Sequence, residues 1–200
     1  ELISDRSYVF IYPIAIWIPV KTIRFDDVAF SLDKIAARHG FKLTVDRVIS
    51  IDAETKTITL SEGGARTVDH LVIATGASKV KHEGIENTLS ICGAPEQSLM
   101  LKDKIDALVA KGEGKIVFGF GGNPNDPSGV RGGPGFELFF NLHHHLKKLG
   151  IRDKFEMTFF APMASPGARM GEKALQLMDM MFKRNRFGAH YGKKIKRFEK

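Results

Sequence analysis

The chain has 200 residues, 43% of them hydrophobic, which is enough for one large or two small domains with a buried core and argues against a disordered chain. Its net charge of +7 is confined to one end, because residues 183–200 hold eight Lys or Arg and one Glu, whereas the other residues hold 22 basic and 22 acidic side chains. A single cysteine excludes an internal disulfide framework.

The first predicted element is a short buried strand at residues 1–4. The most apolar stretch follows at residues 7–20, but its fourteen residues include two prolines, so it is too short and too interrupted to span a bilayer. No basic segment precedes it, as one would in a signal peptide. Because the chain opens on Glu1 in what resembles the end of a strand, we expect it to be an excerpt of a longer protein.

The next elements are a helix and an antiparallel meander. Asp26 or Asp27 is expected to cap a helix that ends at His39, with Gly40 as its left-handed terminating residue. Three β-rich runs follow, separated by the turn-forming sequences DAET and SEGG. They lie at residues 42–51, 56–60 and 67–74. The last run is apolar throughout, which is typical of a strand covered on both faces.

The second half alternates strands and helices, an order that indicates a parallel sheet with helices on its faces. After a helix at 94–110, strands are predicted at 115–120 and 154–161 and helices at 135–149 and 167–186. The last helix carries one apolar stripe, which we interpret as core. Its members are Met170, Ala174, Leu177, Met178, Met181 and Phe182. The predicted division is residues 1–85 and residues 86–200.

A glycine-rich loop at residues 119–135 follows the strand at 115–120. A dinucleotide-binding loop needs G-x-G-x-x-G with its helix beginning inside the motif, so that the helix N-terminus meets the pyrophosphate. Here about eleven residues, including two prolines, separate the first glycines from the helix. The spacing therefore argues against NAD binding, although a long loop at this edge of a parallel sheet is a common place for a ligand site.

Two other features bear on chemistry. Cys92 precedes the helix predicted at 94–110, where the helix dipole would favour its thiolate; a buried, inert cysteine is the alternative. His143, His144 and His145 are consecutive on a helix and point about 100° apart, so they cannot chelate one metal. We read them as a solvated face and predict no metal site.

Taken together, these segments resemble the flavin-dependent pyridine nucleotide–disulfide oxidoreductase superfamily, and within it the sulfide:quinone oxidoreductases. ELISDRSYVFIYP is similar to the end of the second strand of the FAD domain, IATGA to the A-T-G motif, SICGAPEQ to a cysteine-bearing segment, and GPGFELFF to the helix of the second Rossmann-like domain. The resemblance implies an α/β fold: the back part of an FAD-binding Rossmann-like domain with a β-meander (1–85), followed by a second β-α-β domain (86–200).

The resemblance also implies a function and site residues. It implies an FAD-dependent oxidoreductase that passes electrons to a quinone or another acceptor, with Cys92 as the catalytic thiol. The residues expected near FAD are Ser4, Asp5, Arg6, Pro13, Val48, Ala74, Thr75 and Gly76. No nucleic-acid motif is present; a homo-oligomer is compatible with the sequence. The location implied is cytoplasmic or peripheral to a membrane, with the basic end able to meet a membrane surface.

Two departures from the family leave alternatives open. The glycine-rich loop that holds the FAD pyrophosphate, and a C-terminal flavin-binding segment, have no counterpart in this sequence. Arg131 stands where sulfide enzymes carry a redox cysteine, shortly before the G-P-x-F-E stretch. A type II NADH dehydrogenase-like enzyme and a non-catalytic interaction domain derived from the fold are the alternatives.

Overall fold

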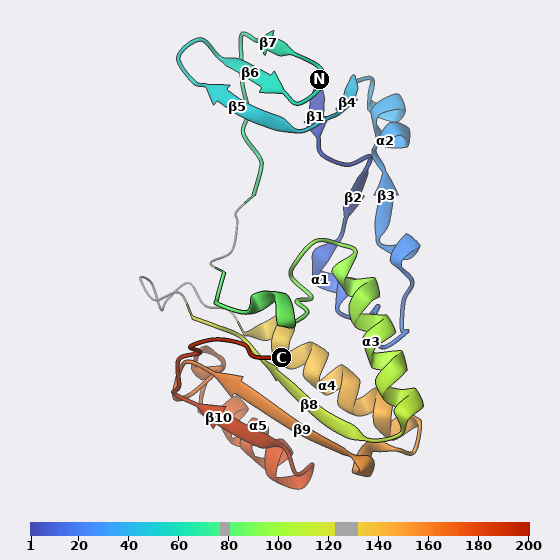
Figure 1. Ribbon diagram of the computed structural model, residues 1–200, viewed down its shortest axis with the longest axis vertical. Helices are drawn as coiled ribbons and strands as arrows, with labels where there is room; N and C mark the ends of the chain where they lie inside the picture. The colour runs from blue at the N-terminus through green and yellow to red at the C-terminus, as the bar shows by residue number, and fades with distance from the viewer. Residues whose placement is uncertain (77–80, 123–131) are drawn as a thin grey trace. The chain divides into compact units, whose positions relative to one another are not determined.

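The computed structural model describes residues 1–76, 81–122 and 132–200, and the chain forms two compact units (Figure 1). Unit 1 comprises Glu1–Ile11 and Asp26–Lys79, and unit 2 comprises Tyr12–Phe25 and Val80–Lys200. The chain therefore passes between the units more than once. The domain boundary predicted at residue 85 stays a prediction.

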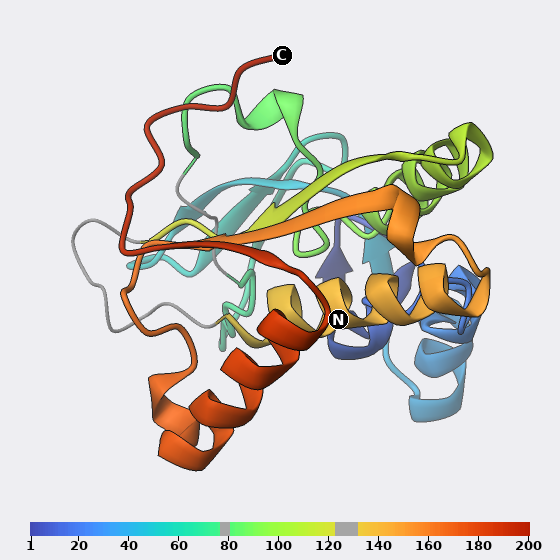
Figure 2. The same cartoon turned by 90° about the horizontal axis from the view of Figure 1, so that it is seen from below.

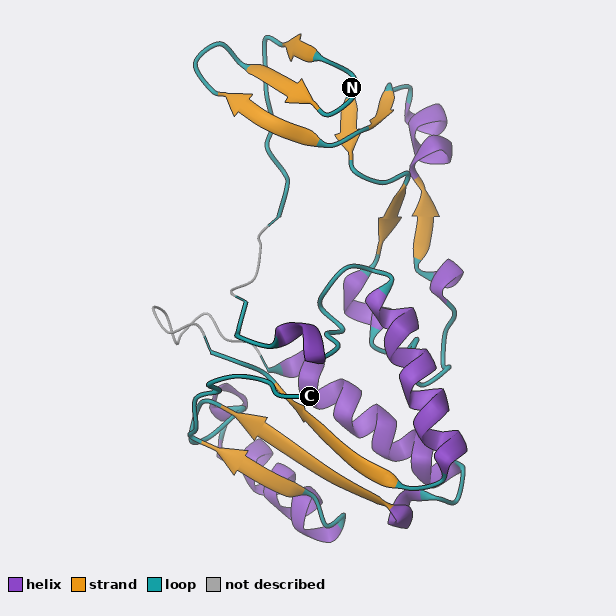
Figure 3. Cartoon of the chain, in the orientation of Figure 1, coloured by secondary structure: helices purple, strands orange, loops and turns teal. Residues whose placement is uncertain are grey.

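Unit 1 is a set of small sheets, shown as orange arrows in Figure 3. β1 (Leu2–Ser4) pairs in parallel with β4 (Leu43–Val45), and β2 (Tyr8–Phe10) pairs antiparallel with β3 (Ala29–Ser31). β5 (Val48–Asp52), β6 (Thr57–Leu60) and β7 (Ala65–Thr67) form the antiparallel meander. The strand expected at residues 1–4 and the run expected at 56–60 are thus present. The run expected at 42–51 forms two strands, of which β4 pairs with β1 and only β5 belongs to the meander.

The helix expected to start at Asp26 or Asp27 begins later. Phe25–Asp27 is a short 3-10 turn, and α2 spans Leu32–His39. Residues 29–31 cannot be helical because they pair with β2 as a strand. Ser31 is the N-terminal cap, its hydroxyl accepting the Lys34 amide at 3.4 Å. The expected end is correct, since Gly40 follows with φ of +69°.

The prediction of a third meander strand at residues 67–74 is wrong. β7 occupies 65–67, and residues 68–76 form no strand. Val72 and Ile73 are 87% and 58% exposed, so the interpretation as a strand covered on both faces is also wrong in this structure. An apolar run becomes a strand only where a neighbour completes its hydrogen bonds, and no described strand pairs with this one.

Unit 2 is built on a parallel sheet of order β10-β9-β8. Its strands are β8 (Gly114–Gly119), β9 (Phe155–Ala161) and β10 (Gly188–Tyr191). The helices are α1 (Tyr12–Ala15), α3 (Gln97–Lys111), α4 (Gly133–Lys148) and α5 (Glu172–Arg184). Short 3-10 turns are η2 (Ile85–Asn87), η4 (Arg152–Lys154) and η5 (Ala168–Met170). The parallel sheet predicted from the β-α-β order is confirmed, and β10 is an added strand that the sequence did not indicate.

Both connecting helices, α4 and α5, lie on one face of this sheet (Figure 2). This follows from the strand order, because two successive right-handed crossovers that advance in the same direction place their helices on the same side. Alternate residues of β9 point toward them and are buried, whereas Val117 on the other face of the sheet is 65% exposed. The expectation of helices on both faces is therefore corrected for α4 and α5.

The core of unit 2 is rich in phenylalanine. Phe139 of α4 is fully buried against Phe159 of β9 and Phe182 of α5, with ring centroids 5.3 and 5.8 Å away. Each such side chain contributes about 1.5–3 kcal/mol by leaving water. The methionine stripe contributes less than expected, since only Phe182 of its members is buried and Met170 and Leu177 are more than half exposed.

Candidate cofactor site

The end of β1 gathers three of the predicted FAD-binding residues. Ser4 is the last residue of the strand, and its hydroxyl accepts the Arg6 amide at 3.3 Å. The Arg6 guanidinium contacts the Asp5 carboxylate at 3.0 Å and lies 5.9 Å from the centre of the Tyr8 ring. The hydrogen bond from Arg6, with the charges of Arg6 and Arg47, lowers the pKa of Asp5, so this carboxylate is ionised at neutral pH.

The adjacent parallel strand brings the predicted Val48 near these residues. The Asp46 amide, just beyond β4, donates to the Ser4 carbonyl at 2.9 Å, and β5 begins two residues later at Val48. Residues 4–6 and 46–48 therefore meet at the carboxyl ends of two parallel strands, the edge where α/β sheets bind ligands. The pairing was not visible in the sequence, because it depends on which strand lies beside β1.

Asp46 itself was not among the predicted residues. Its carboxylate accepts the Ser61 hydroxyl and the amides of Glu62 and Gly63, the last at 2.8 Å. The Ser61 hydrogen bond and these amides lower the pKa of Asp46 to about 2. Asp46 thus ties the meander turn to the strand end, and no signal marked it in the sequence, because it lies inside the run expected at 42–51.

The remaining predicted cofactor residues lie outside this cluster. Ala74, Thr75 and Gly76 follow the meander as exposed residues without regular structure, and Gly76 has φ of +72°. Pro13 is an exposed residue of α1 and belongs to unit 2. The structure therefore brings together Ser4, Asp5 and Arg6, with Val48 two residues beyond Asp46, which bonds to Ser4. The described contacts do not join these residues to the A-T-G residues.

The described part of the glycine-rich loop is filled by protein. A Cβ on Gly119 would lie 2.3 Å from the Phe160 carbonyl oxygen, and one on Gly121 would lie 2.1 Å from Nε2 of His82. These glycines are thus explained by close packing at the carboxyl end of β8, with no dinucleotide required. Most of the loop expected at 119–135, including Arg131, lies outside the described residues.

Cys92 is exposed and lies in a run of turns before α3. Its amide donates to the Ser90 hydroxyl at 3.3 Å. α3 begins at Gln97 with Glu96 at the cap position, so the helix expected from residue 94 starts three residues later and Cys92 is not in its first turn. Both earlier interpretations are corrected: the thiol is not buried, and it is not adjacent to the helix N-terminus.

The interpretation of the three histidines as a solvated face is wrong for His143. Its Nδ1 accepts a 2.8 Å hydrogen bond from Nε of Arg152, and its ring meets Phe187 edge-on with centroids 4.9 Å apart. Burial, followed by the positive charge of Arg152, lowers the pKa of His143 to about 4. Of the triplet only His144 is exposed, and His145 is half-buried.

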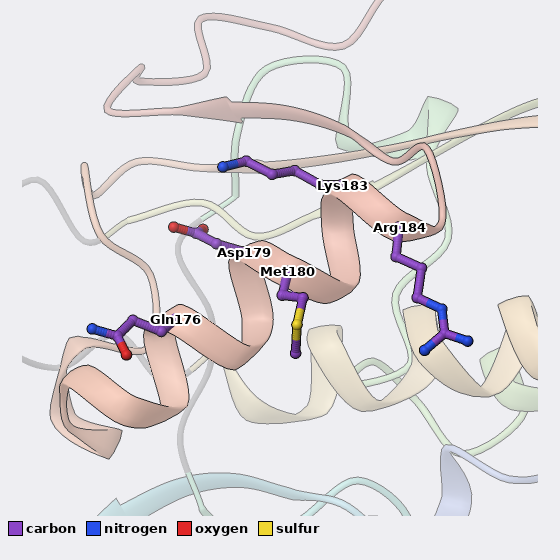
Figure 4. A pocket seen from close by; sticks show the side chains of 5 residues that line it. All are labelled: Gln176, Asp179, Met180, Lys183 and Arg184. Carbon is purple, nitrogen blue, oxygen red and sulfur yellow. The ribbon is translucent and has the colours of Figure 1, made fainter.

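Among the described residues no group of three or more His, Cys, Asp or Glu could hold a metal ion, and no helix is long and apolar enough to cross a membrane. A surface pocket lies on α5 (Figure 4). It is lined by Gln176, Asp179, Met180, Lys183 and Arg184, all from one helix.

Several proteins of known structure share this architecture. No protein-family profile matches the chain. The crystal structure of sulfide:quinone oxidoreductase from Aquifex aeolicus matches with a TM-score of 0.84 and 28% identity, over 99% of this chain and 46% of that one. A ferredoxin reductase from Rhodopseudomonas palustris (TM-score 0.71, 17% identity) and NDH2 from Plasmodium falciparum (0.77, 14%) share the fold, each covered to less than half its length. The fold is that of the FAD-dependent pyridine nucleotide–disulfide oxidoreductases.

One relative resembles this chain in sequence as well as in fold. The sulfide-quinone reductase of Aquifex aeolicus (strain VF5) is 35% identical over 160 residues, which are 79% of this chain and 36% of that protein. The chain is therefore a homologue of part of sulfide-quinone reductase, an oxidoreductase, and spans less than half the length of the relatives it matches. The family resemblance and the α/β fold inferred from the sequence are confirmed.

Proposed function

We propose that this chain is part of an FAD-dependent oxidoreductase of the sulfide:quinone type, which passes electrons from its donor through flavin to a quinone. The observation that carries the proposal is the 35% identity over 160 residues to a sulfide-quinone reductase, supported by the 0.84 TM-score to a solved sulfide:quinone oxidoreductase. A protein at the membrane surface or in the cytoplasm fits this activity.

The residues at the end of β1 fit one part of FAD, the adenosine ribose. Its hydroxyl groups need acceptors, and Ser4 and the ionised Asp5 supply a hydroxyl and a carboxylate at the carboxyl end of a parallel strand. The Arg6 guanidinium holds the Asp5 carboxylate in place at 3.0 Å. The sequence contains no G-x-G-x-x-G, so the fit does not extend to the pyrophosphate.

The other predicted residues take roles from the family resemblance. The backbone of Val48 would face the adenine, and Pro13 with Ala74, Thr75 and Gly76 would lie near the flavin. When bound, the flavin supplies the redox chemistry, and the protein positions it and tunes it. Cys92 is the candidate residue that would take up sulfide sulfur, since it is the one cysteine in the sequence and its thiol is exposed. Joining sulfide to this thiol as a persulfide releases two electrons and two protons, and the flavin, when bound, would accept the electrons.

The alternative of an NADH dehydrogenase has support from the fold alone, because NDH2 is only 14% identical. Against it, the glycines at the end of β8 are packed against His82 and Phe160, where a dinucleotide loop would leave its backbone open to a pyrophosphate. A non-catalytic interaction domain has no specific contact in its favour.

The decisive experiment uses the natural protein that contains this chain. Purified protein should show flavin absorbance near 450 nm, which sulfide bleaches and a soluble quinone restores. Asp5→Ala should weaken FAD binding about tenfold, on the order of one charged hydrogen bond, whereas Glu54→Ala, in an exposed turn of the same unit, should not. Protein without flavin, or flavin reduced by NADH and not by sulfide, would reject the proposal.

A further inference from the structure

The end of the basic C-terminal segment is paired with the chain before Cys92. We name Arg197–Glu199 the strap and residues 82–92 the connector. The Phe198 amide donates to the Glu83 carbonyl at 2.9 Å, and the Asn87 side-chain amide donates to the Phe198 carbonyl at 3.0 Å. Arg197 and Glu83 form a parallel β-bridge. The backbone N–H and C=O of Phe198 are therefore both hydrogen-bonded to the connector.

Gly84 is the point of closest approach between the two segments. A Cβ on Gly84 would lie 1.9 Å from the Phe198 carbonyl oxygen and 2.9 Å from its carbonyl carbon. The φ of Gly84 is +75°, a backbone conformation that favours glycine. Sequence and geometry thus agree that this position is occupied by glycine because the strap lies directly on it.

The connector is also held from its other side. The His82 ring meets Phe198 edge-on, with centroids 6.4 Å apart, and its Nε2 lies against Gly121 at the carboxyl end of β8. The connector therefore lies between the strap and the sheet edge. Both flanking segments belong to the same compact unit, and β10 leads into the strap.

Between η2 and α3 the connector has no helix or strand of its own. Thr88 donates to the Ile85 carbonyl at 2.8 Å, and the Cys92 amide to the Ser90 hydroxyl at 3.3 Å, but both contacts are local. The start of the connector is tied to distant residues through His82, Glu83, Gly84 and Asn87. The strap thus holds the chain at Asn87, five residues before Cys92.

We propose that the strap is a positioning element for Cys92: it fixes the connector against the end of β8 and so sets the accessibility of the thiol. The consequence for catalysis rests on the proposed function, in which Cys92 takes up the sulfide sulfur while flavin accepts the electrons. The strap contacts neither the reacting atoms nor the thiol; it acts through the connector. Part of the basic end is thereby a structural element of this unit, and its charge need not mark a binding surface.

The test compares two variants with a matched control in the natural protein. Gly84→Ala places a methyl group where the Phe198 carbonyl lies, and Asn87→Ala removes one hydrogen bond to that carbonyl. Gly150→Ala is the control, because Gly150 has a similar φ of +71° in the same unit with nothing within 4 Å of its Cβ position. Far-UV circular dichroism verifies that all three are folded.

The readouts are the rate of Cys92 alkylation across pH, measured on the Cys92 peptide by mass spectrometry, and the rate of proteolysis within the connector. Losing one hydrogen bond of about 1 kcal/mol should make the connector open about fivefold more often, so Asn87→Ala should raise both rates about fivefold and Gly84→Ala further. Rates equal to those of Gly150→Ala in both variants would overturn the proposal.

Flavin reduction by sulfide separates this inference from the proposed function. If Cys92→Ser retains full reduction by sulfide, the role of the thiol in the proposed function fails. Raised alkylation and proteolysis in the strap variants would still support the positioning of Cys92 by the strap. If Cys92→Ser is inactive, Gly84→Ala should lower kcat more than it changes KM for the quinone; an unchanged kcat would count against the strap.

Discussion

Arg152 closes the corner where α4, β9 and the end of α5 meet, and its removal is the most informative perturbation of unit 2. Its guanidinium donates to Nδ1 of His143 at 2.8 Å, to the Phe155 carbonyl at 2.6 Å and to the Asn185 carbonyl at 3.0 Å. It also lies 5.2 Å from the centre of the Phe187 ring. Arg152→Ala leaves three half-buried acceptors without their donor.

The expected loss follows from these contacts. Hydrogen bonds from a charged group contribute about 1.5–3 kcal/mol when buried, and the corner is only half-buried, so about 1 kcal/mol for each is appropriate. We therefore expect Arg152→Ala to lower the free energy of unfolding by about 2–3 kcal/mol, measured by urea denaturation with near-UV circular dichroism. Arg152→Lys should recover little, since an ammonium group cannot reproduce the planar fork.

A neighbouring arginine provides the control. Arg186 pairs with Asp153, and both side chains are at least 80% exposed. Such a pair contributes little, so Arg186→Ala should change the free energy of unfolding by less than about 0.5 kcal/mol. If Arg152→Ala costs no more than Arg186→Ala, the corner is not held by the guanidinium and our reasoning about it is wrong.

Four further predictions concern pH and ligands. Because the folded pKa of His143, about 4, is below the unfolded value near 6.5, the unfolded state binds more protons and stability should fall as pH drops from about 6.5 to about 4; His143→Leu should flatten that slope in urea titrations. The pKa of Asp46 is lowered to about 2 from 3.8, so its contribution, present above pH 3.8, should disappear between those values, and Asp46→Asn should abolish this acid dependence. Calorimetry should detect no micromolar NADH binding, and binding lost in Gly121→Val would contradict our interpretation of the loop. Finally, the 200-residue chain alone should bind FAD poorly, because its sequence has no pyrophosphate loop; stoichiometric yellow flavin in the purified chain would contradict this.

Local patterns in the sequence identified most of the regular elements. The strands at β1, β6, β8 and β9 and the end of α2 at Gly40 depend on apolar runs and turn residues that act over a few positions. The β-α-β order was sufficient to predict a parallel sheet. These features do not require knowledge of which segments meet in space.

The features that could not be predicted from the sequence depend on contacts with residues elsewhere in the fold. The sequence of residues 29–31 favours a helix, but these residues pair with β2 as a strand. The sequence of residues 67–74 favours a strand, but no described strand pairs with residues 68–74. His143 looks exposed until Arg152, nine positions later, donates to it. At the candidate site, Ser4 and Asp5 came from family resemblance, whereas Asp46 emerged only from the contact between neighbouring strands.

The segment Tyr12–Phe25 belongs to unit 2 although unit 1 precedes and follows it in the chain. Val20 is part of the phenylalanine-rich core, Lys21 pairs with Asp106 at 2.7 Å, and the Trp17 indole donates to Glu137, 120 positions away, at 3.1 Å. During synthesis this segment leaves the ribosome before its partners, which follow 85 to 120 residues later, while its apolar side chains stay uncovered. Slow, chaperone-dependent folding of unit 2 is the expected result, and the chain cannot mature strictly from its N-terminus onward.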